Sequence, residues 1–241
     1  MIQPQWPAPS NIHAFTTTRD GGVSLAPFDS FNLASHVNDN PDHVMANRQQ
    51  LMQQHNLPRM PIWLNQTHTT YPVELAANST TLSQECDAAY TRCADMPCTV
   101  LTADCLPLLV CNRQGTEVAA IHAGWRGLQA GVIENTIDQL TSSPDDLLVW
   151  LGPAIGPSAF EINNEIRLAF LARYPQNSVA FKQVNQCWFA DIYALARVSL
   201  QSRGISQIFG GDYCTFSENE HFFSYRRDGL TGRMASIIWF H

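Results

Sequence analysis

Two histidines and one cysteine stand in short polar segments whose residue types suit metal chemistry. His68 follows Gln-Thr, Cys105 follows Ala-Asp, and His122 opens the segment His-Ala-Gly-Trp-Arg-Gly. Imidazole and thiolate are ligands that zinc takes up in proteins, and three such ligands leave a tetrahedral ion one open position. The set therefore predicts a catalytic type of zinc site.

The spacing of two predicted strands brings two of these residues together. Cys105 opens the strand expected over Cys105–Cys111, and His122 closes the strand expected over Glu117–His122. The segment Asn112–Gly115 between them is typical of a hairpin turn. A hairpin symmetric about positions 113 and 114 places Cys105 directly opposite His122, with Cβ atoms about 4.5–5.5 Å apart. The pair is then close enough to share one ion, and His68 supplies a third ligand from another strand end.

The same geometry supports two other interpretations. Cys105 can act as a nucleophile with His122 as its base. Alternatively, the histidines are hydrogen-bonded strand ends and the cysteine is a packing residue. Spacing alone leaves all three open.

Arginines provide a further clue to function. On the helix expected over Pro41–His55, Arg48 interrupts an apolar face formed by Val44 and Leu51. An inward arginine usually pairs with an anion, although a side chain at the edge of the stripe can also reach solvent. Near the end of the chain, a strand over Phe222–Arg226 is expected to place one arginine of the Arg-Arg pair on each of its faces.

Composition excludes several classes of protein. Of the 241 residues 45% are hydrophobic and 15% are charged, and the formal net charge is −7. This balance argues against disorder and against binding of nucleic acid or anionic membranes through bulk charge. The longest apolar runs are far shorter than a membrane span requires. Because the start lacks a signal-peptide pattern and seven cysteines form no Cys-x-x-Cys pair, we expect a cytoplasmic protein without a disulfide framework.

The elements that must position these residues are strand-rich and mixed. Asn40 and Pro41 fit the start of the first helix as N-cap and first helical residue, and further helices are expected over Leu128–Leu140, Glu165–Ala172 and Asp191–Ser202. Short helices among sheet-forming runs indicate one α+β domain over residues 1–241. Besides the strands given above, we expect strands at Ile12–Thr18, Pro61–Gln66, Asp87–Thr91, Cys98–Thr102, Leu147–Leu151, Ile205–Phe209 and Arg233–Phe240.

Several motifs together resemble a known family. The sequence is similar to the bacterial YfiH type of the laccase-domain, or polyphenol oxidase, family, whose members are regarded as purine nucleoside phosphorylases. Around His68 the chain has Gln-Thr-His-Thr where members often have Gln-Val-His-Gly. The blocks that carry the resemblance are Thr18–Ser24, Phe31–Val37, Asn47–Arg48, Thr102–Cys105, His122–Gly127, Leu151–Gly156, Cys214–Thr215 and Phe223–Arg227.

The resemblance implies a fold, a cofactor and an activity. It implies a single-domain αββα sandwich with mixed β-sheets, in which His68, Cys105 and His122 hold Zn²⁺, with Cu²⁺ able to replace it in vitro. It further implies phosphorolysis of adenosine, inosine, guanosine and methylthioadenosine, and deamination of adenosine, by a monomer. Arg48 is the first candidate to hold phosphate, and Asn32 matches a family position that could orient substrate or phosphate.

Two other activities compete with this one. Some family members are linked to peptidoglycan editing, which would make the chain a cysteine or zinc hydrolase, or amidase, acting on peptidoglycan precursors. The older family label implies copper-dependent oxidation of phenols. A multicopper oxidase normally uses about ten histidines in His-x-His pairs, whereas this chain has eight histidines and no such pair.

Overall fold

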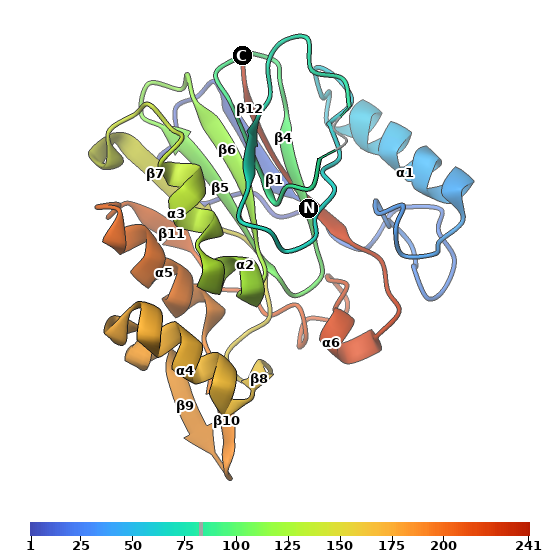
Figure 1. Ribbon diagram of the computed structural model, residues 1–241. Coiled ribbons are helices and arrows are strands. Elements are labelled where there is room, and N and C mark those ends of the chain that lie inside the picture. Colours follow the sequence, from blue (N-terminus) through green and yellow to red (C-terminus); the bar gives the residue numbers. More distant parts are fainter. Residues whose placement is uncertain (82–83) are drawn as a thin grey trace.

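Two β-sheets pack face to face, and helices cover the outer face of each (Figure 1). The computed structural model describes residues 1–81 and 84–241. The smaller sheet has the order β1-β12-β4, with β1 at Ile12–Thr16, β4 at Cys98–Thr102 and β12 at Met234–Phe240. The larger sheet has the order β11-β7-β5-β6-β3-β2, with strands Ile208–Gly210, Leu147–Leu151, Leu106–Asn112, Val118–Ala123, Ala88–Thr91 and Pro72–Glu74.

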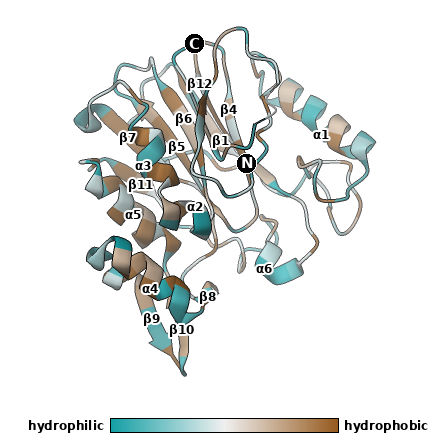
Figure 2. Ribbon diagram, in the orientation of Figure 1, coloured by the Kyte–Doolittle hydropathy of each residue, from teal (hydrophilic) through white to brown (hydrophobic). Residues whose placement is uncertain are grey.

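The alternation of side chains along each strand defines the layers. In β5, Leu108 and Val110 join the cluster beneath the helices, whereas Leu109 and Cys111 join the cluster between the two sheets. Figure 2 shows the strands of the larger sheet as predominantly hydrophobic, as expected for a sheet buried on both faces. In β12, Ile237 faces the helix beyond the smaller sheet. The layers are therefore helix, sheet, sheet and helix, and the predicted αββα sandwich of the α+β class is confirmed.

The helices form the two outer layers. On the larger sheet lie α2 (Trp125–Ala130), α3 (Val132–Ile137) and α5 (Ile192–Ser202), and α1 (Pro41–Gln54) covers the smaller sheet. The Asn40 side chain accepts a hydrogen bond from Asp42 N at 2.9 Å, which confirms the predicted cap of α1. The remaining elements are α4 (Asn164–Arg173), α6 (Tyr225–Asp228), the 3₁₀ helices Pro144–Asp146 and Pro175–Ala180, and a small sheet of β8 (Glu161–Ile162), β10 (Cys187–Ala190) and β9 (Phe181–Val184).

The larger sheet is mixed, as expected, whereas the smaller sheet is not. In the larger sheet β11 pairs with β7 and β2 pairs with β3 in parallel, whereas β5 is antiparallel to both of its neighbours. The smaller sheet is antiparallel throughout. Of residues 1–81 and 84–241, none lies in a helix long and apolar enough to cross a membrane.

The predicted register of the β5–β6 hairpin is wrong by two residues. His122 lies opposite Pro107, not opposite Cys105. The hairpin turns between positions 114 and 115 because Gly115 takes a left-handed conformation with φ +69°, and the Asn112 side chain accepts hydrogen bonds from Thr116 N and Glu117 N. A loop over residues 113–117 therefore replaces the shorter turn that the sequence suggested.

Two predicted strands and one predicted helix also differ from the elements observed in the structure. Residues 61–66 contribute a single bridge at Asn65, because the Gln66 side chain takes the place of a strand partner by bonding to both Leu101 N and Leu101 O at 2.8 Å. Residues 222–226 contain the start of α6 instead of a strand. The single helix expected over residues 128–140 is divided into α2 and α3 at Gly131, which has φ +108°.

A buried carboxylate fastens the chain before β6 to the loop after α3. Glu117 is 2% exposed and accepts hydrogen bonds from Thr141 N and from the backbone and hydroxyl of Ser142. Arg92 pairs with it at 2.8 Å and with the exposed Glu74 at 2.7 Å. Burial raises the pKa of Glu117, but these hydrogen bonds outweigh burial and lower it below its ordinary value. The ionised form therefore stabilises the fold.

We expect Glu117→Gln to lower the free energy of unfolding at pH 7 by about 2–4 kcal/mol, since it removes a buried, hydrogen-bonded charge. Because the folded pKa is depressed, this stabilisation is present above the unfolded pKa of about 4.3 and is lost as pH falls through the folded pKa. Urea unfolding measured from pH 7 to pH 3 should show the free energies of unfolding of wild type and Glu117→Gln converging at low pH. The matched change Glu74→Gln removes the exposed partner of the same arginine and should cost less than about 1 kcal/mol. Equal losses for both variants would contradict this assignment.

Candidate metal centre

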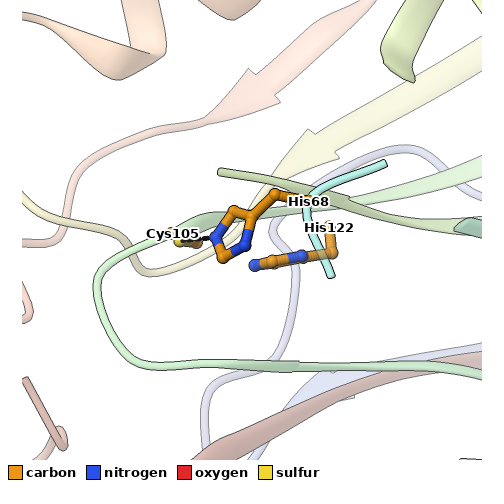
Figure 3. A group of neighbouring side chains, drawn as sticks. All are labelled: His68, Cys105 and His122. Atoms are coloured by element: carbon orange, nitrogen blue, oxygen red, sulfur yellow. Dashed lines mark hydrogen bonds between the residues drawn. The ribbon is translucent and has the colours of Figure 1, made fainter. Parts of the chain in front are cut away.

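Three predicted ligand residues meet at one end of the larger sheet (Figure 3). His122 lies in β6, Cys105 directly precedes β5, and His68 lies in the segment before β2. One ligand atom from each residue lies within 4.8 Å of the other two, and Cys105 Sγ is 3.7 Å from His68 Nε2. The two imidazole rings have centroids 5.0 Å apart. Side chains at these separations can surround a single metal ion.

The carboxylate of Asp87 holds both histidines in place. It lies directly before β3, is fully buried, and its Oδ1 is 2.6 Å from His122 Nδ1 and 3.1 Å from His68 N. Its Oδ2 accepts hydrogen bonds from the backbone and hydroxyl of Thr69, at 2.6 and 2.9 Å, and from Thr67 N. Burial raises the pKa of Asp87, but hydrogen bonds from His122 and Thr69 outweigh it and lower that pKa. With Nδ1 engaged, His122 presents Nε2 to the cluster, as a metal-binding histidine does.

A second carboxylate fixes the turn that carries Cys105. Asp104 has the left-handed φ of +85°, an uncommon conformation for this residue type outside turns. Its Oδ1 accepts a hydrogen bond from the Thr215 hydroxyl and its Oδ2 accepts one from Arg226 N, both at 2.6 Å. Its carbonyl accepts a third from Ile155 N. These three bonds aim Cys105 at the histidines although it lies outside the β5–β6 ladder.

Glycine at position 124 keeps the space beside the three ligands open. A Cβ at Gly124 would lie 2.8 Å from His68 Nε2 and 3.1 Å from Cys105 Sγ, closer than side-chain atoms normally approach. Two imidazoles and one thiolate are a donor set that zinc and copper both accept. The donor chemistry, the orientation of His122 and the space left free at Gly124 all fit a bound metal ion, with one coordination position left for another ligand.

The thiol and the buried imidazole shift each other's protonation. Burial raises the pKa of Cys105, but the charges and hydrogen bonds of His122 and His68 outweigh burial and lower it to about 6. Burial lowers the pKa of His122, but the Cys105 thiolate and Asp87 outweigh it and raise it to about 9. In the metal-free protein these opposite shifts favour a thiolate beside an imidazolium, and the thiolate is the ionic form of a metal-ligating cysteine.

A cavity of about 530 Å³ opens onto the cluster, within the usual range for small-molecule pockets. Its lining combines apolar and aromatic side chains with charged groups from several distant segments. The apolar part includes Trp125, Ile155, Phe160 and Ile192, and the polar part includes His36, Asp104, Arg126, Arg226 and Arg233.

The two other predicted site residues lie behind this lining. Arg48 donates from Nε and Nη2 to Leu33 O at 3.0 and 2.8 Å, and its guanidinium lies 4.1 Å from the centroid of the Trp63 ring. Burial lowers the pKa of Arg48 to about 10. Asn32 is fully buried, and its Oδ1 accepts from Ala34 N and Arg233 N. Neither residue lines the cavity within the part of the chain that the structure describes.

Sequence reasoning missed Asp87 and two of the arginines that line the cavity, Arg126 and Arg233, although it pointed to the Arg-Arg pair at 226 and 227. The signal for Asp87 was an acidic residue at the start of an apolar strand, where a carboxylate needs buried partners. The predicted strand through the Arg-Arg pair is wrong, because these residues lie in α6. Arg226 lines the cavity, whereas Arg227 donates to Thr215 O, Phe216 O and Asp228.

We expect Cys105 of the metal-free protein to react with iodoacetamide as a thiolate at unusually low pH, with a midpoint near pH 6, because the histidines lower its pKa. Asp87→Asn removes the charge that supports the imidazolium of His122, so it should move the midpoint upward. Peptide mapping by mass spectrometry across pH 4–10 measures both. A wild-type midpoint near the ordinary thiol value of about 8.5 would contradict the proposed ion pair.

Comparison with known proteins agrees with the architecture and the motifs. A family described as "Multi-copper polyphenol oxidoreductase laccase" matches residues 13–241. The chain is 54% identical to "Purine nucleoside phosphorylase YfiH" of Escherichia coli K12, over 99% of this chain and 98% of that protein. It is 50% identical to a purine nucleoside phosphorylase of Pseudomonas aeruginosa, over 99% of this chain and 97% of the relative.

Two solved structures have the same fold as this chain. A crystal structure from Neisseria meningitidis, assigned to a family of unknown function, has a TM-score of 0.92 and 45% identity, and covers 98% of this chain and 97% of that one. The structure of YlmD from Geobacillus stearothermophilus has a TM-score of 0.88 at 26% identity, covering 98% and 94% of the two chains. The chain therefore belongs to the laccase-like polyphenol oxidoreductase family that includes the YfiH proteins.

Proposed function

We propose that this chain is a zinc-dependent purine nucleoside phosphorylase that acts on adenosine, inosine, guanosine and methylthioadenosine, and that its cavity also deaminates adenosine. The observation that carries the proposal is the convergence of His68, Cys105 and His122 on a cavity with aromatic and arginine-rich walls. The names of the bacterial relatives, which match over nearly the whole chain, support the same activity.

The cavity's lining suits the two substrates of phosphorolysis. In that reaction a phosphate oxygen bonds to C1′ of the ribose while the bond from C1′ to N9 of the purine breaks, and the bonding electrons leave with the base. The aromatic rings of Trp125 and Phe160 in the lining can stack on a purine, and the arginines can attract a doubly charged anion. When bound at the three ligands, zinc supplies Lewis-acid chemistry that polarises oxygen and makes water more acidic.

Asn32 and Arg48 act, on this proposal, as positioning residues. Arg48 holds the carbonyl of Leu33, and Asn32 holds both Ala34 N and Arg233 N. These contacts fix the short segment that leads to His36, whose side chain lines the cavity. On this proposal Arg48 serves phosphate binding indirectly, and does not itself contact phosphate as the sequence suggested.

The net charge and the state of the cysteines support the proposed cellular location and class of substrate. The net charge of −7 disfavours nucleic acid and favours small substrates drawn to a local basic cavity. All seven cysteines are free, which fits the reducing cytoplasm. We propose a cytoplasmic monomer whose partners are nucleosides and phosphate.

We expect Cys105→Ala to lose bound zinc and activity together, because the thiolate is one of three ligands. Metal content is measured by atomic emission on protein purified in parallel with wild type. Cys93→Ala changes a cysteine outside the cavity and should keep both zinc and activity. Should Cys105→Ala retain a full equivalent of zinc while losing activity, Cys105 would be a nucleophile and the hydrolase alternative would replace the phosphorylase.

We expect release of hypoxanthine from inosine to depend on inorganic phosphate, since phosphate is the acceptor of the ribosyl group. Chromatography of base and sugar products with and without phosphate measures this dependence, and ribose 1-phosphate should appear in equal amount to the base. Deamination of adenosine consumes water and should proceed without phosphate. Base release at the same rate without phosphate would reject phosphorolysis and leave a nucleoside hydrolase.

A further inference from the structure

The charged groups that line the cavity are mainly positive. Arg126, Arg226 and Arg233 line it together with a single carboxylate, that of Asp104. Both oxygens of this carboxylate already accept hydrogen bonds, from the Thr215 hydroxyl and from Arg226 N. The cavity therefore offers several cationic donors and has an excess of positive charge beside the metal ligands.

Arg233 differs from the other two arginines in its burial. Arg126 and Arg226 are exposed, whereas Arg233 is half-buried at the start of β12. Its Nη1 donates to Thr231 O and Gly232 O at 2.7 and 2.9 Å. Over residues 1–81 and 84–241 its Nε and Nη2 have no hydrogen-bond acceptor and no carboxylate pairs with it. A half-buried guanidinium with an unused two-pronged edge is well suited to take an oxyanion.

Arg233 lines the same cavity as the three candidate metal ligands. Burial lowers the pKa of Arg233, while the charges of Cys105 and Asp104 act in the opposite direction. Burial and the positive charge of Arg233 also lower the pKa of His36, so this imidazole tends to be neutral and able to share an anion by hydrogen bonding. The ring of Tyr225 lies 5.7 Å from the guanidinium.

The backbone that carries Arg233 is held rigidly. Asn32 Oδ1 accepts a hydrogen bond from Arg233 N at 3.0 Å, and Leu33 N donates to Arg233 O. A Cβ at Gly232 would lie 2.7 Å from the ring of Phe223 and 2.9 Å from Asn32 Cβ, so this stretch fits only with glycine there. A guanidinium on such a fixed stem loses little freedom on binding an anion.

We infer that Arg233 is the phosphate-binding residue of the cavity, with Nε and Nη2 each donating to one phosphate oxygen. This assignment rests on the proposed function for its substrate. The phosphate then lies on the β12 side next to the metal ligands, and the purine lies against the apolar wall of Trp125, Phe160 and Ile192. Asn32 acts through Arg233 by fixing its backbone.

Three variants test the assignment through phosphate kinetics and through direct binding. Arg233→Gln should raise the KM for phosphate about 30-fold or more, the loss expected for a charge-assisted pair of hydrogen bonds. Arg233→Lys should recover only part of this, because an ammonium lacks the two-pronged edge. The Kd of inosine measured without phosphate should stay within about twofold. Arg203→Gln, the same change at a half-buried arginine that pairs with Asp138 and does not line the cavity, should leave both constants unchanged.

Thermal stabilisation by inorganic phosphate alone provides a readout that does not need turnover. Wild type should be stabilised by phosphate and Arg233→Gln should not, at equal zinc content. Asn32→Ala should raise the KM for phosphate while keeping kcat and the inosine Kd, which loss of fold would not do. An unchanged phosphate KM in Arg233→Gln would overturn the assignment while leaving phosphorolysis intact. If wild type binds phosphate through Arg233 but releases no base, the proposed function fails and the anion site stands.

Discussion

The ionised carboxylate of Asp87 is the interaction on which the site depends. Its two oxygens accept five hydrogen bonds, from His122 Nδ1, from the backbone of Thr67, His68 and Thr69, and from the Thr69 hydroxyl. These bonds connect the segment before β2 to the end of β6, two stretches that share no ladder. A buried carboxylate without such donors would be strongly unfavourable. The burial of Asp87 therefore requires these hydrogen bonds, and the same bonds fix the positions of both histidines.

The site lies where the separate hydrophobic clusters end. Ile155, Phe160 and Ile192 belong to the cluster under the helices, and Leu101 belongs to the cluster beneath α1. Strands from both sheets and loops from opposite ends of the sequence therefore contribute to one cavity. This arrangement gives the cavity apolar side chains from these clusters and polar side chains from the loops and strand ends around them.

Much of the scaffold could be predicted because its signals are local. The Asn40 cap and Pro41 marked the start of α1, a continuous apolar run marked β7, and stretches rich in apolar and β-branched residues marked β4 and β12. The three metal ligands could be proposed from residue type and strand ends, although the register argument that paired Cys105 with His122 was wrong. Gly115 and Asn112 set that register, and their combined effect depends on backbone conformation that spacing does not show.

The roles of the polar residues could not be predicted in the same way. Helical periodicity showed that Arg48 faces inward, but it did not show that Leu33 O and Trp63 are its partners. Asp87 and Arg233 gain their importance from contacts with residues 35 and 201 positions away in the chain. Such contacts follow from the packing of whole layers, so they became visible only with the structure.

The affinity for zinc of Asp87→Asn, compared with wild type, tests the central claim most directly. A competition titration with a chelating dye measures both dissociation constants, and Asp138→Asn, a change at an exposed carboxylate, serves as the control. If Asp87 orients the ligands, the variant should bind zinc about 10–100-fold more weakly while unfolding cooperatively. A folded Asp87→Asn protein that binds zinc as tightly as wild type would contradict the account.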